Sequence, residues 1–321
     1  MNILITGATG FVGRQLVSDL LKQSQDIELF LVARNDPREH LPIAHLKDRN
    51  IHFIQVDSIE NLSAQQLSSN IDVVIHLAAK AHVVENNELA GEYERINVDG
   101  TKAVAQVAIA KQVKHFIYVS SIKVNGDETS IQAFSEDDIP SPEGVYALTK
   151  FQAEQYLRSI SSSSLRVSII RPPLVYGKGV KANMNALVSL VKRLPVLPLG
   201  AINNRRSLIS VGNLNHFILT ILSTKPAEQY DYSVFLVADK SPVSTAQLCQ
   251  NIAQALGKSI MMLSIPPALM AFAFKLIGKG TMWNKLSSNL EISGQNAMRY
   301  YHWEARYPMV EELAYLKEEN N

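Results

Sequence analysis

Met1-Asn-Ile-Leu-Ile-Thr-Gly-Ala-Thr-Gly-Phe-Val-Gly13 is the stretch of this sequence that decides the fold. Its apolar run Ile3–Ile5 predicts a buried strand, and the three glycines that follow predict a tight turn. A helix is indicated next by an apolar stripe formed by Val12, Leu16, Val17, Leu20 and Leu21. Free backbone N–H groups at a helix N-terminus favour phosphate, and glycine lets the backbone approach it closely. The stretch therefore predicts a turn that holds a dinucleotide pyrophosphate, the alternative being a tight turn without a ligand.

Length and composition agree with a folded, soluble protein of the cytoplasm. The chain has 321 residues, a length that suits one large domain or two unequal ones, and a net charge of +1. So balanced a charge argues against a nucleic-acid partner. A single cysteine, Cys249, fits a reducing compartment, and a first strand that starts at residue 2 leaves no room for a signal peptide. We expect no metal site.

The segment Ile260–Ile277 is the most apolar part of the chain. It contains Pro266, Pro267 and Lys275, and the helix predicted after the prolines is too short to span a bilayer. We interpret it as a core helix or a helix on the substrate side, and shallow contact with a membrane surface stays open as the alternative. No membrane span is expected.

Strands and helices alternate along most of the sequence. Helical periodicity is clearest in Ala90–Val113 and Tyr146–Ile160, and this order predicts an α/β, doubly wound, parallel-sheet Rossmann fold. We expect a dinucleotide-binding domain over residues 1–177, to which residues 205–237 return, and a smaller C-terminal substrate-binding lobe over 178–321. Further strands are predicted at Ile27–Ala33, Ile51–Val56, Val73–Leu77, Phe116–Val119 and Val167–Ile170.

A phenol and an ammonium group are four residues apart in Tyr146-Ala-Leu-Thr-Lys150, on one face of the predicted helix. A phenol has a pKa near 10, and a neighbouring cation would bring it toward neutral pH, where the phenol can transfer protons. Ser121, just past a predicted strand, could hold the oxygen that Tyr146 protonates. Ser120 is the rival serine. Without further support, Tyr146 and Lys150 would be an exposed helical pair.

These motifs together resemble the short-chain dehydrogenase/reductase superfamily. Gly-x-x-Gly-x-x-Gly is its glycine spacing, and Thr6-Gly-Ala-Thr-Gly-Phe-Val-Gly13 looks like its extended branch, which handles sugar nucleotides. The resemblance covers about the first 215 residues. It implies a nicotinamide cofactor on the glycine turn and a catalytic set of Ser121, Tyr146 and Lys150.

Further cofactor-binding residues follow from the resemblance. Relatives place a carboxylate after the third strand, line the cofactor with a segment like His76–Ala79, and position the active-site lysine with an asparagine. Asn97 matches this asparagine, and the alternative is that its side chain forms hydrogen bonds within its own helix. The cofactor-binding residues implied are Gly7, Thr9, Gly10, Phe11, Val12, Gly13, Arg34, Asp57, Ser58, Leu77, Ala78, Ala79, Asn97, Tyr146, Lys150 and Pro173.

The end of the second strand bears on the choice of cofactor. NAD enzymes place an acid there for the ribose hydroxyls, whereas this chain has Ala33 followed by Arg34. An arginine at this point suits a 2′-phosphate, so NADP is favoured over NAD. Arg34 could equally be a loop cation that stacks on adenine.

Candidate substrate residues also rest on the resemblance. Arg206 matches an arginine with which relatives bind a nucleotide-sugar pyrophosphate, and Asn183 lies where they use an asparagine. Ser207 departs from the aspartate that relatives have there, and Arg299 is the only candidate for their second arginine. Arg206 could also be an exposed loop residue. The substrate-binding set is Ser121, Lys123, Asn183 and Arg206, for a nucleotide sugar that is UDP-linked.

The absence of one acidic pair argues against a dehydratase. Sugar-nucleotide dehydratases carry Thr-Asp-Glu where this chain has Ser121-Ile-Lys123, so the acid and base for eliminating water are missing. The segments 120–126 and 171–183 look most like the UDP-N-acetylquinovosamine dehydrogenase group, 4-ketoreductases of bacterial polysaccharide synthesis. A UDP-sugar 4-epimerase with tightly bound NAD is the alternative. A 3β-hydroxysteroid-type dehydrogenase and a non-enzymatic NADP-binding sensor are more distant ones, and a homodimer is compatible with all of them.

Overall fold

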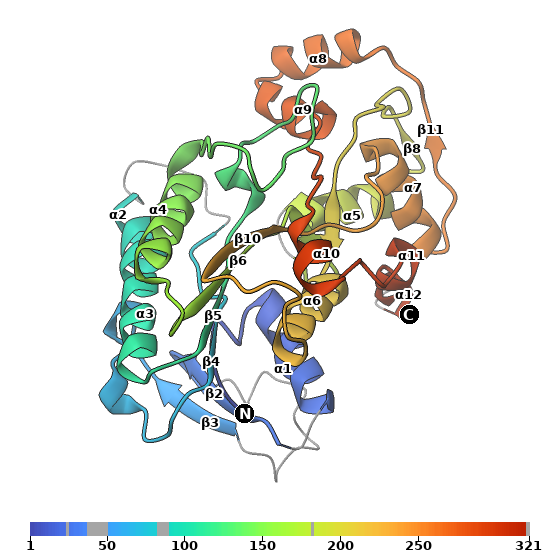
Figure 1. Cartoon of the computed structure of the whole chain (residues 1–321). Helices are drawn as coiled ribbons and strands as arrows, with labels where there is room; N and C mark the ends of the chain where they lie inside the picture. The colour runs from blue at the N-terminus through green and yellow to red at the C-terminus, as the bar shows by residue number, and fades with distance from the viewer. Residues whose placement is uncertain (24–25, 37–50, 82–89, 181–182, 319–321) are drawn as a thin grey trace.

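The N-terminal unit has the predicted strand, turn and helix. In the computed structural model, which describes residues 1–23, 26–36, 51–81, 90–180 and 183–318, β1 (Asn2–Thr6) leads through the turn into α1 (Phe11–Gln23) (Figure 1). The apolar residues of β1 are buried because the strand lies in the middle of a sheet. α1 buries one side, made of Gly13, Leu16, Val17, Leu20 and Leu21.

The sheet has seven parallel strands in the order β10-β6-β5-β4-β1-β2-β3. Ile3 on β1 lies between Leu29 on β2 and Val73 on β4, so the chain order reverses at β1 and β4. This is the doubly wound order of nucleotide-binding folds, and the predicted fold class is confirmed. The remaining strands are β2 (Glu28–Ala33), β3 (Ile51–Gln55), β4 (Val73–His76), β5 (His115–Val119), β6 (Arg166–Arg171) and β10 (Tyr232–Leu236).

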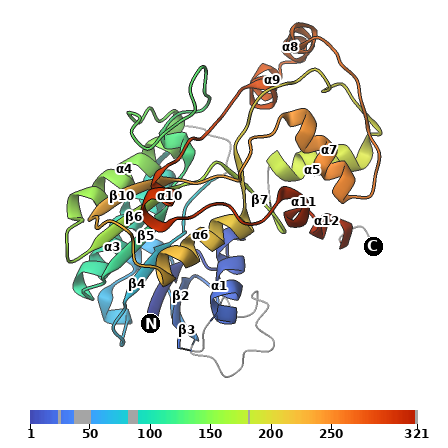
Figure 2. The same cartoon turned by 45° about the vertical axis from the view of Figure 1, so that its right-hand side comes forward.

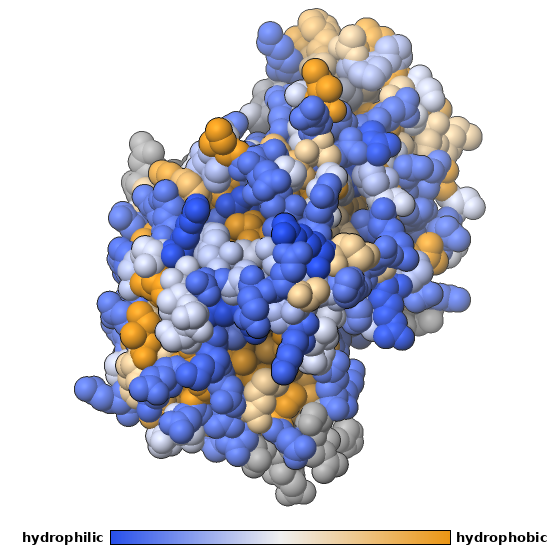
Figure 3. All heavy atoms as spheres, viewed as in Figure 1, coloured by the Kyte–Doolittle hydropathy of each residue, from blue (hydrophilic) through white to orange (hydrophobic). Residues whose placement is uncertain are grey.

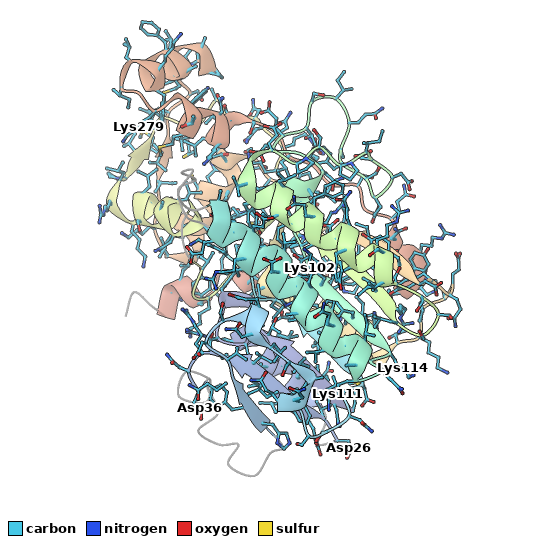
Figure 4. The ribbon with its side chains drawn as sticks, turned by 90° about the vertical axis from the view of Figure 1, so that its left-hand side faces the viewer. Asp26, Asp36, Lys102, Lys111, Lys114 and Lys279 are labelled. Atoms are coloured by element: carbon cyan, nitrogen blue, oxygen red, sulfur yellow. The ribbon has the colours of Figure 1, made fainter. Side chains whose placement is uncertain are left out.

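Helices cover both faces of the sheet, because alternate strand residues point to opposite sides. Ile3 and Ile5 pack with α1, α6 (Val211–Ser223) and α10 (Asn296–Tyr301), while Leu4 packs with α3 (Gly100–Ala110) and α4 (Gly144–Ile160). Figure 4 shows α3 and α4 side by side on their face. A parallel sheet buried on both faces explains the near-continuous apolar runs of its strands.

The segment predicted as one regular helix from Ala90 contains a π-helical section. It consists of α2 (Ala90–Tyr93), the π-helical η5 (Glu94–Asp99) and α3, in unbroken succession. The 3₁₀ turns η2 (Ile59–Asn61), η3 (Ala64–Gln66) and η6 (Ile122–Val124) occupy connections after β3 and β5. π-Helical turns are often found at functional sites, and this one carries Asn97.

The C-terminal part forms a second body with its own core beside the sheet (Figure 2). Its core packs Tyr176, Leu197 and Leu248 among other apolar residues. None of the described helices is long and apolar enough to cross a membrane. The division at residue 177 stays a prediction. The elements of this part are β7 (Leu174–Tyr176), α5 (Asn183–Arg193), β8 (Val196–Leu197), β9 (Leu208–Ser210), α7 (Thr245–Ala255), β11 (Met261–Met262), α8 (Pro267–Leu276), α9 (Gly280–Ser287), α11 (Met309–Glu312) and α12 (Tyr315–Glu318).

Candidate active site

The glycine turn after β1 has no room for side chains. A Cβ at Gly13 would lie 2.2 Å from the Gly7 carbonyl oxygen, and one at Gly7 would lie 2.7 Å from the Ala78 nitrogen. Gly7 also has a φ of +73°, which favours glycine, and the Gly10 N–H donates to the Gly7 carbonyl at 2.9 Å. The turn is thus a cradle of bare backbone at the start of α1. Because the first N–H groups of a helix have no partner within the helix, the cradle fits a pyrophosphate.

The cradle meets the end of β4 at the point where the strand order reverses. The Ala78 N–H donates to Thr6 Oγ1 at 3.2 Å, and Gly7 lies against the backbone of Leu77 and Ala78. Two segments predicted from the sequence to bind the cofactor are therefore brought together at the carboxyl edge of the sheet, where doubly wound folds bind ligands. Of the other predicted residues here, Gly10 and Ala79 are exposed, and Thr9, Phe11 and Val12 are half-buried.

His76 links neighbouring elements at this edge of the sheet, and its imidazole is neutral. Its Nδ1 lies 2.5 Å from Thr6 Oγ1, and its Nε2 lies 3.0 Å from Thr101 Oγ1 on α3. Complete burial, reinforced by the charge of Lys150, lowers the pKa of His76 to about 3. A neutral imidazole with both nitrogens in use joins β1, β4 and α3.

Arg34, Asp57 and Ser58 lie at the carboxyl ends of the neighbouring strands β2 and β3. The side chains of Arg34 and Asp57 are exposed. The Arg34 carbonyl accepts from Gln55 Nε2 at 3.2 Å, which joins the ends of the two strands. Ser58 Oγ accepts from Arg95 at 2.7 Å and donates to Glu60, so its hydroxyl already has protein partners.

Two adjacent serines after β5 have different partners. Ser120 is buried and its hydroxyl donates to Glu154, whereas Ser121 is half-buried and forms a side-chain hydrogen bond with Tyr146. The backbone of Ser121 is extended, with φ −156° and ψ 147°, so successive side chains point in opposite directions. Ser121 Oγ also accepts from the Lys123 N–H at 3.3 Å. Of the two serines, Ser121 is the one that lies beside the phenol.

Tyr146 lies in the first turn of α4, close to Tyr93. The two rings meet edge to face with centroids 6.4 Å apart. Burial raises the pKa of Tyr146 to about 12; the Ser121 hydrogen bond opposes this shift and Tyr93 adds to it. The expectation that Lys150 lowers this pKa is therefore wrong for the protein without cofactor, because burial of the phenol outweighs the groups that favour its ionised form.

Lys150 lies one turn further along α4 and is only 1% exposed. Its Nζ donates to the Val119 carbonyl at 2.8 Å and lies 4.0 Å from the centroid of the Tyr118 ring. Burial lowers the pKa of Lys150 to about 7, against the opposing effect of Glu154. The amine can therefore gain or lose its proton near neutral pH.

A buried ion pair beneath Lys150 was not predicted from the sequence. Arg171 at the end of β6 holds Glu154 with an Nη2–Oε2 distance of 2.5 Å, and both side chains are almost fully buried. Arg171 Nη1 also donates to Asn125 Oδ1 at 2.9 Å. The signal that could have revealed Glu154 is its spacing: it follows Lys150 by four residues, on the helix face that carries Tyr146.

Asn97 contacts the residue before the lysine. Its Oδ1 accepts from the Lys80 N–H at 2.8 Å, and its Nδ2 donates to Thr149 Oγ1 at 3.1 Å. These bonds connect the π-helical η5, the segment after β4 and α4. Asn97 thus lies where it can position α4 next to Lys150. Its side chain forms these hydrogen bonds outside its own helix.

The predicted substrate residues are spread over several segments. Lys123 Nζ pairs with Asp127 at 2.8 Å, and Arg206 Nη1 donates to the carbonyls of Lys285 and Ser288 at 3.2 and 3.0 Å. Asn183 begins α5, but its side chain lies outside the described residues. Pro173, predicted for the cofactor, is buried just after β6. The remaining candidate, Arg299, pairs with Glu228 at 2.6 Å at an exposed position.

The seven-stranded parallel sheet and the glycine cradle at its reversal point define a Rossmann-like α/β protein. Comparison with known proteins gives the family. Residues 3–235 match the NAD dependent epimerase/dehydratase family, and the chain belongs to it.

Relatives of known activity cover nearly the whole chain. A UDP-glucose 4-epimerase of Vibrio cholerae is 37% identical over 94% of this chain and 90% of its own length. An N-acetyl-alpha-D-glucosaminyl-diphospho-ditrans,octacis-undecaprenol 4-epimerase of Escherichia coli O157:H7 is 26% identical over 87% of this chain and 81% of its own length. Among solved structures, UDP-glucuronic acid 4-epimerase from Bacillus cereus in complex with NAD has a TM-score of 0.79 at 20% identity and covers 100% of both chains. This structural likeness bears out the fold.

Proposed function

We propose that this protein transfers a hydride at C4 of a UDP-linked sugar. The observation that carries the proposal is the hydrogen bond between Ser121 and Tyr146, with the buried Lys150 one turn along the same helix. A bound nicotinamide dinucleotide would supply or accept the hydride. The bare backbone of Gly7 to Gly13 is where its pyrophosphate fits.

Each residue of the set has a chemical task. Ser121 holds the oxygen on C4 by a hydrogen bond, and Tyr146 exchanges a proton with that oxygen. Because burial raises the pKa of Tyr146 to about 12 in the free protein, the phenol carries its proton and can donate it to a ketone oxygen. Lys150, with a pKa of about 7, changes charge near neutral pH and can stabilise a phenolate once Tyr146 has given up its proton.

For the net reaction, the first candidate is a 4-ketoreductase that uses NADP. Support comes from Arg34, whose exposed side chain follows Ala33 at the end of β2, the place where NAD enzymes carry an acid. A guanidinium there offers charge-assisted hydrogen bonds to a 2′-phosphate. The resemblance of segments 120–126 and 171–183 to 4-ketoreductases of polysaccharide synthesis points the same way.

The second candidate is a UDP-sugar 4-epimerase that retains NAD. It is supported by the Vibrio cholerae UDP-glucose 4-epimerase, which is 37% identical over 94% of this chain. Ser121, Tyr146 and Lys150 serve both reactions, since each reaction requires hydride transfer at C4. The two candidates differ in whether the cofactor leaves after each turnover.

Cofactor content and product analysis separate the two candidates. We would measure the nicotinamide in protein purified without added cofactor, then incubate it with UDP-glucose, UDP-N-acetylglucosamine and a UDP-4-keto-6-deoxy sugar. A reductase should be largely free of cofactor and should oxidise NADPH with the keto sugar. If the purified protein contains stoichiometric NAD and interconverts the C4 epimers, it is the epimerase. If it binds the cofactor but catalyses neither reaction, a non-enzymatic NADP-binding sensor is favoured.

The proposed setting is a homodimer in the cytoplasm. The thiol of Cys249 is buried, and burial raises its pKa to about 12, so it is an inert core residue and not half of a disulfide. This agrees with a reducing compartment. Sedimentation equilibrium would test the homodimer.

A further inference from the structure

The helical hairpin formed by α8 and α9 uses only its inner side for packing. Met270 on α8 and Trp283 on α9 are buried, and the rings of Phe274 and Trp283 lie 5.6 Å apart. These contacts attach α8 to α9 and to the core of the second body. The apolar residues on the other side of α8 are not needed for this packing.

The outer side of α8 exposes a stripe of large apolar side chains. Leu269, Phe272 and Leu276 are 60%, 62% and 71% exposed, and their spacing of three and four residues puts them on one helix face. Ile277, just beyond the helix, is 63% exposed. Figure 3 shows apolar residues gathered over α8 at the top of the molecule. Contiguous exposed apolar surface of this kind marks a site of interaction with another surface.

The charged residues of the segment that carries this stripe have a single sign. Between Asp239 and Glu291 the sequence carries five lysines and no Asp or Glu. Lys275, Lys279 and Lys285 belong to the hairpin and are exposed, and no carboxylate among the described residues is paired with them. Lys279 is labelled on the hairpin in Figure 4.

We propose that the outer face of the α8–α9 hairpin docks on an anionic lipid bilayer. The ten residues of α8 extend about 15 Å, too short for a span but suited to lying in the interface with Leu269, Phe272 and Leu276 in the acyl region. The three lysines would then face lipid phosphates. A second copy of this chain fits the face less well, because it would bring lysines against lysines.

The hairpin is firmly attached to the rest of the protein. Arg206 Nη1 donates to the Ser288 carbonyl at 3.0 Å, and Thr245 Oγ1 donates to the Leu286 carbonyl at 2.6 Å. Both bonds hold the end of α9. Docking through the hairpin would therefore orient the whole protein on the membrane, and this inference does not depend on which reaction the protein catalyses.

Binding to vesicles tests the proposal directly. Full-length protein is mixed with vesicles of phosphatidylcholine, with or without about a third phosphatidylglycerol, and the bound fraction is measured by flotation. We expect binding that requires phosphatidylglycerol and decreases with added salt. Protein that does not float with anionic vesicles, or floats equally with both, would overturn the proposal.

Variants separate the apolar from the electrostatic contribution. The triple variant Leu269→Ser, Phe272→Ser, Leu276→Ser should lower the partition coefficient at least tenfold, with Val310→Ser, an exposed apolar residue on α11, as its matched control. The triple change of Lys275, Lys279 and Lys285 to Gln should remove the preference for phosphatidylglycerol. Lys114→Gln, exposed at the far end of the molecule in Figure 4, should bind like the wild type. Wild-type binding by either triple variant contradicts the proposed surface.

A dye attached at a single substituted position tests the proposal even if the triple variants fold poorly. Because Cys249 is buried, a cysteine introduced by Phe272→Cys can be labelled selectively with an environment-sensitive dye. Its emission should shift to shorter wavelength with anionic vesicles, whereas a dye on Val310→Cys should not respond. No shift at position 272 overturns the proposal. A shift that needs no lipid and grows with protein concentration also overturns it, in favour of self-association.

Discussion

The Lys150 ammonium lies 4.0 Å from the centroid of the Tyr118 ring and donates at 2.8 Å to the Val119 carbonyl, both on β5. The π face and the carbonyl oxygen are the contacts that compensate for burying the cation. They do so only in part, since the pKa of Lys150 falls to about 7. The protonation of this one side chain should therefore be visible in the stability of the protein.

Stability should rise with pH above neutrality in a manner that depends on Lys150. The folded pKa of about 7 lies below the ordinary value of 10.5, so between these values the unfolded chain binds a proton that the folded chain lacks. The free energy of unfolding then increases as pH rises through this window. Urea denaturation of cofactor-free protein at several pH values measures the slope, which should be smaller in Lys150→Met. Identical slopes in the two proteins would contradict the shifted pKa.

The two serines after β5 should differ in what their loss affects. Ser120→Ala removes a buried hydrogen bond to the Glu154 carboxylate and should cost about 1.5–3 kcal/mol of stability. Ser121→Ala should leave the melting temperature near that of the wild type and reduce kcat instead. Each variant is the control for the other. If Ser120→Ala lost more activity than Ser121→Ala at equal folded fraction, the roles would be reversed.

Replacement of the phenol hydroxyl should abolish proton transfer and leave the cofactor site intact. Tyr146→Phe is expected to lower kcat by about 10²–10⁴, the usual range for loss of a general acid or base. Dinucleotide affinity, measured by calorimetry, should stay close to that of the wild type. Tyr156→Phe, on the same helix but half-exposed, is the matched control. Activity above about a tenth of wild type in Tyr146→Phe would exclude it as the acid or base.

Cofactor preference should depend on Arg34. If its guanidinium binds a 2′-phosphate, Arg34→Ala should weaken NADP binding by about 1.5–3 kcal/mol and leave NAD binding nearly unchanged. Titration of the apoprotein with both dinucleotides gives the two affinities. Equal losses for NADP and NAD would mean that Arg34 stacks on adenine.

Much of the fold could be predicted because it depends on local patterns. The apolar runs correctly predicted six of the seven strands of the sheet and their parallel arrangement, starting from Ile3–Ile5. The π-helical section at Glu94–Asp99 was missed, since one extra residue per turn hardly changes an apolar pattern over so short a segment. The strand Tyr232–Leu236 was only placed within a broad returning segment, because its partner β6 is more than sixty residues away.

The candidate site was predictable in its members but not in its electrostatics. Spacing on a helix places Tyr146 and Lys150 on one face, yet it does not say that Lys150 is buried or that its amine points to β5. Burial therefore moved the pKa of Tyr146 in the direction opposite to the one expected. The Glu154–Arg171 pair joins a helix to a strand end, and sequence spacing alone does not reveal such a contact.

The adjacency of Ser120 and Ser121 constrains how this segment can change in evolution. The backbone N–H groups of Ser120 and Ile122 pair with the carbonyls of Ile170 and Pro172, so the segment is held in register with the end of β6. A deletion or insertion of one residue within β5 would shift the strand by one position. Side chains that point to one side of the sheet would then point to the other. The length of β5 should therefore stay fixed, and an engineered library should vary this strand only by substitution.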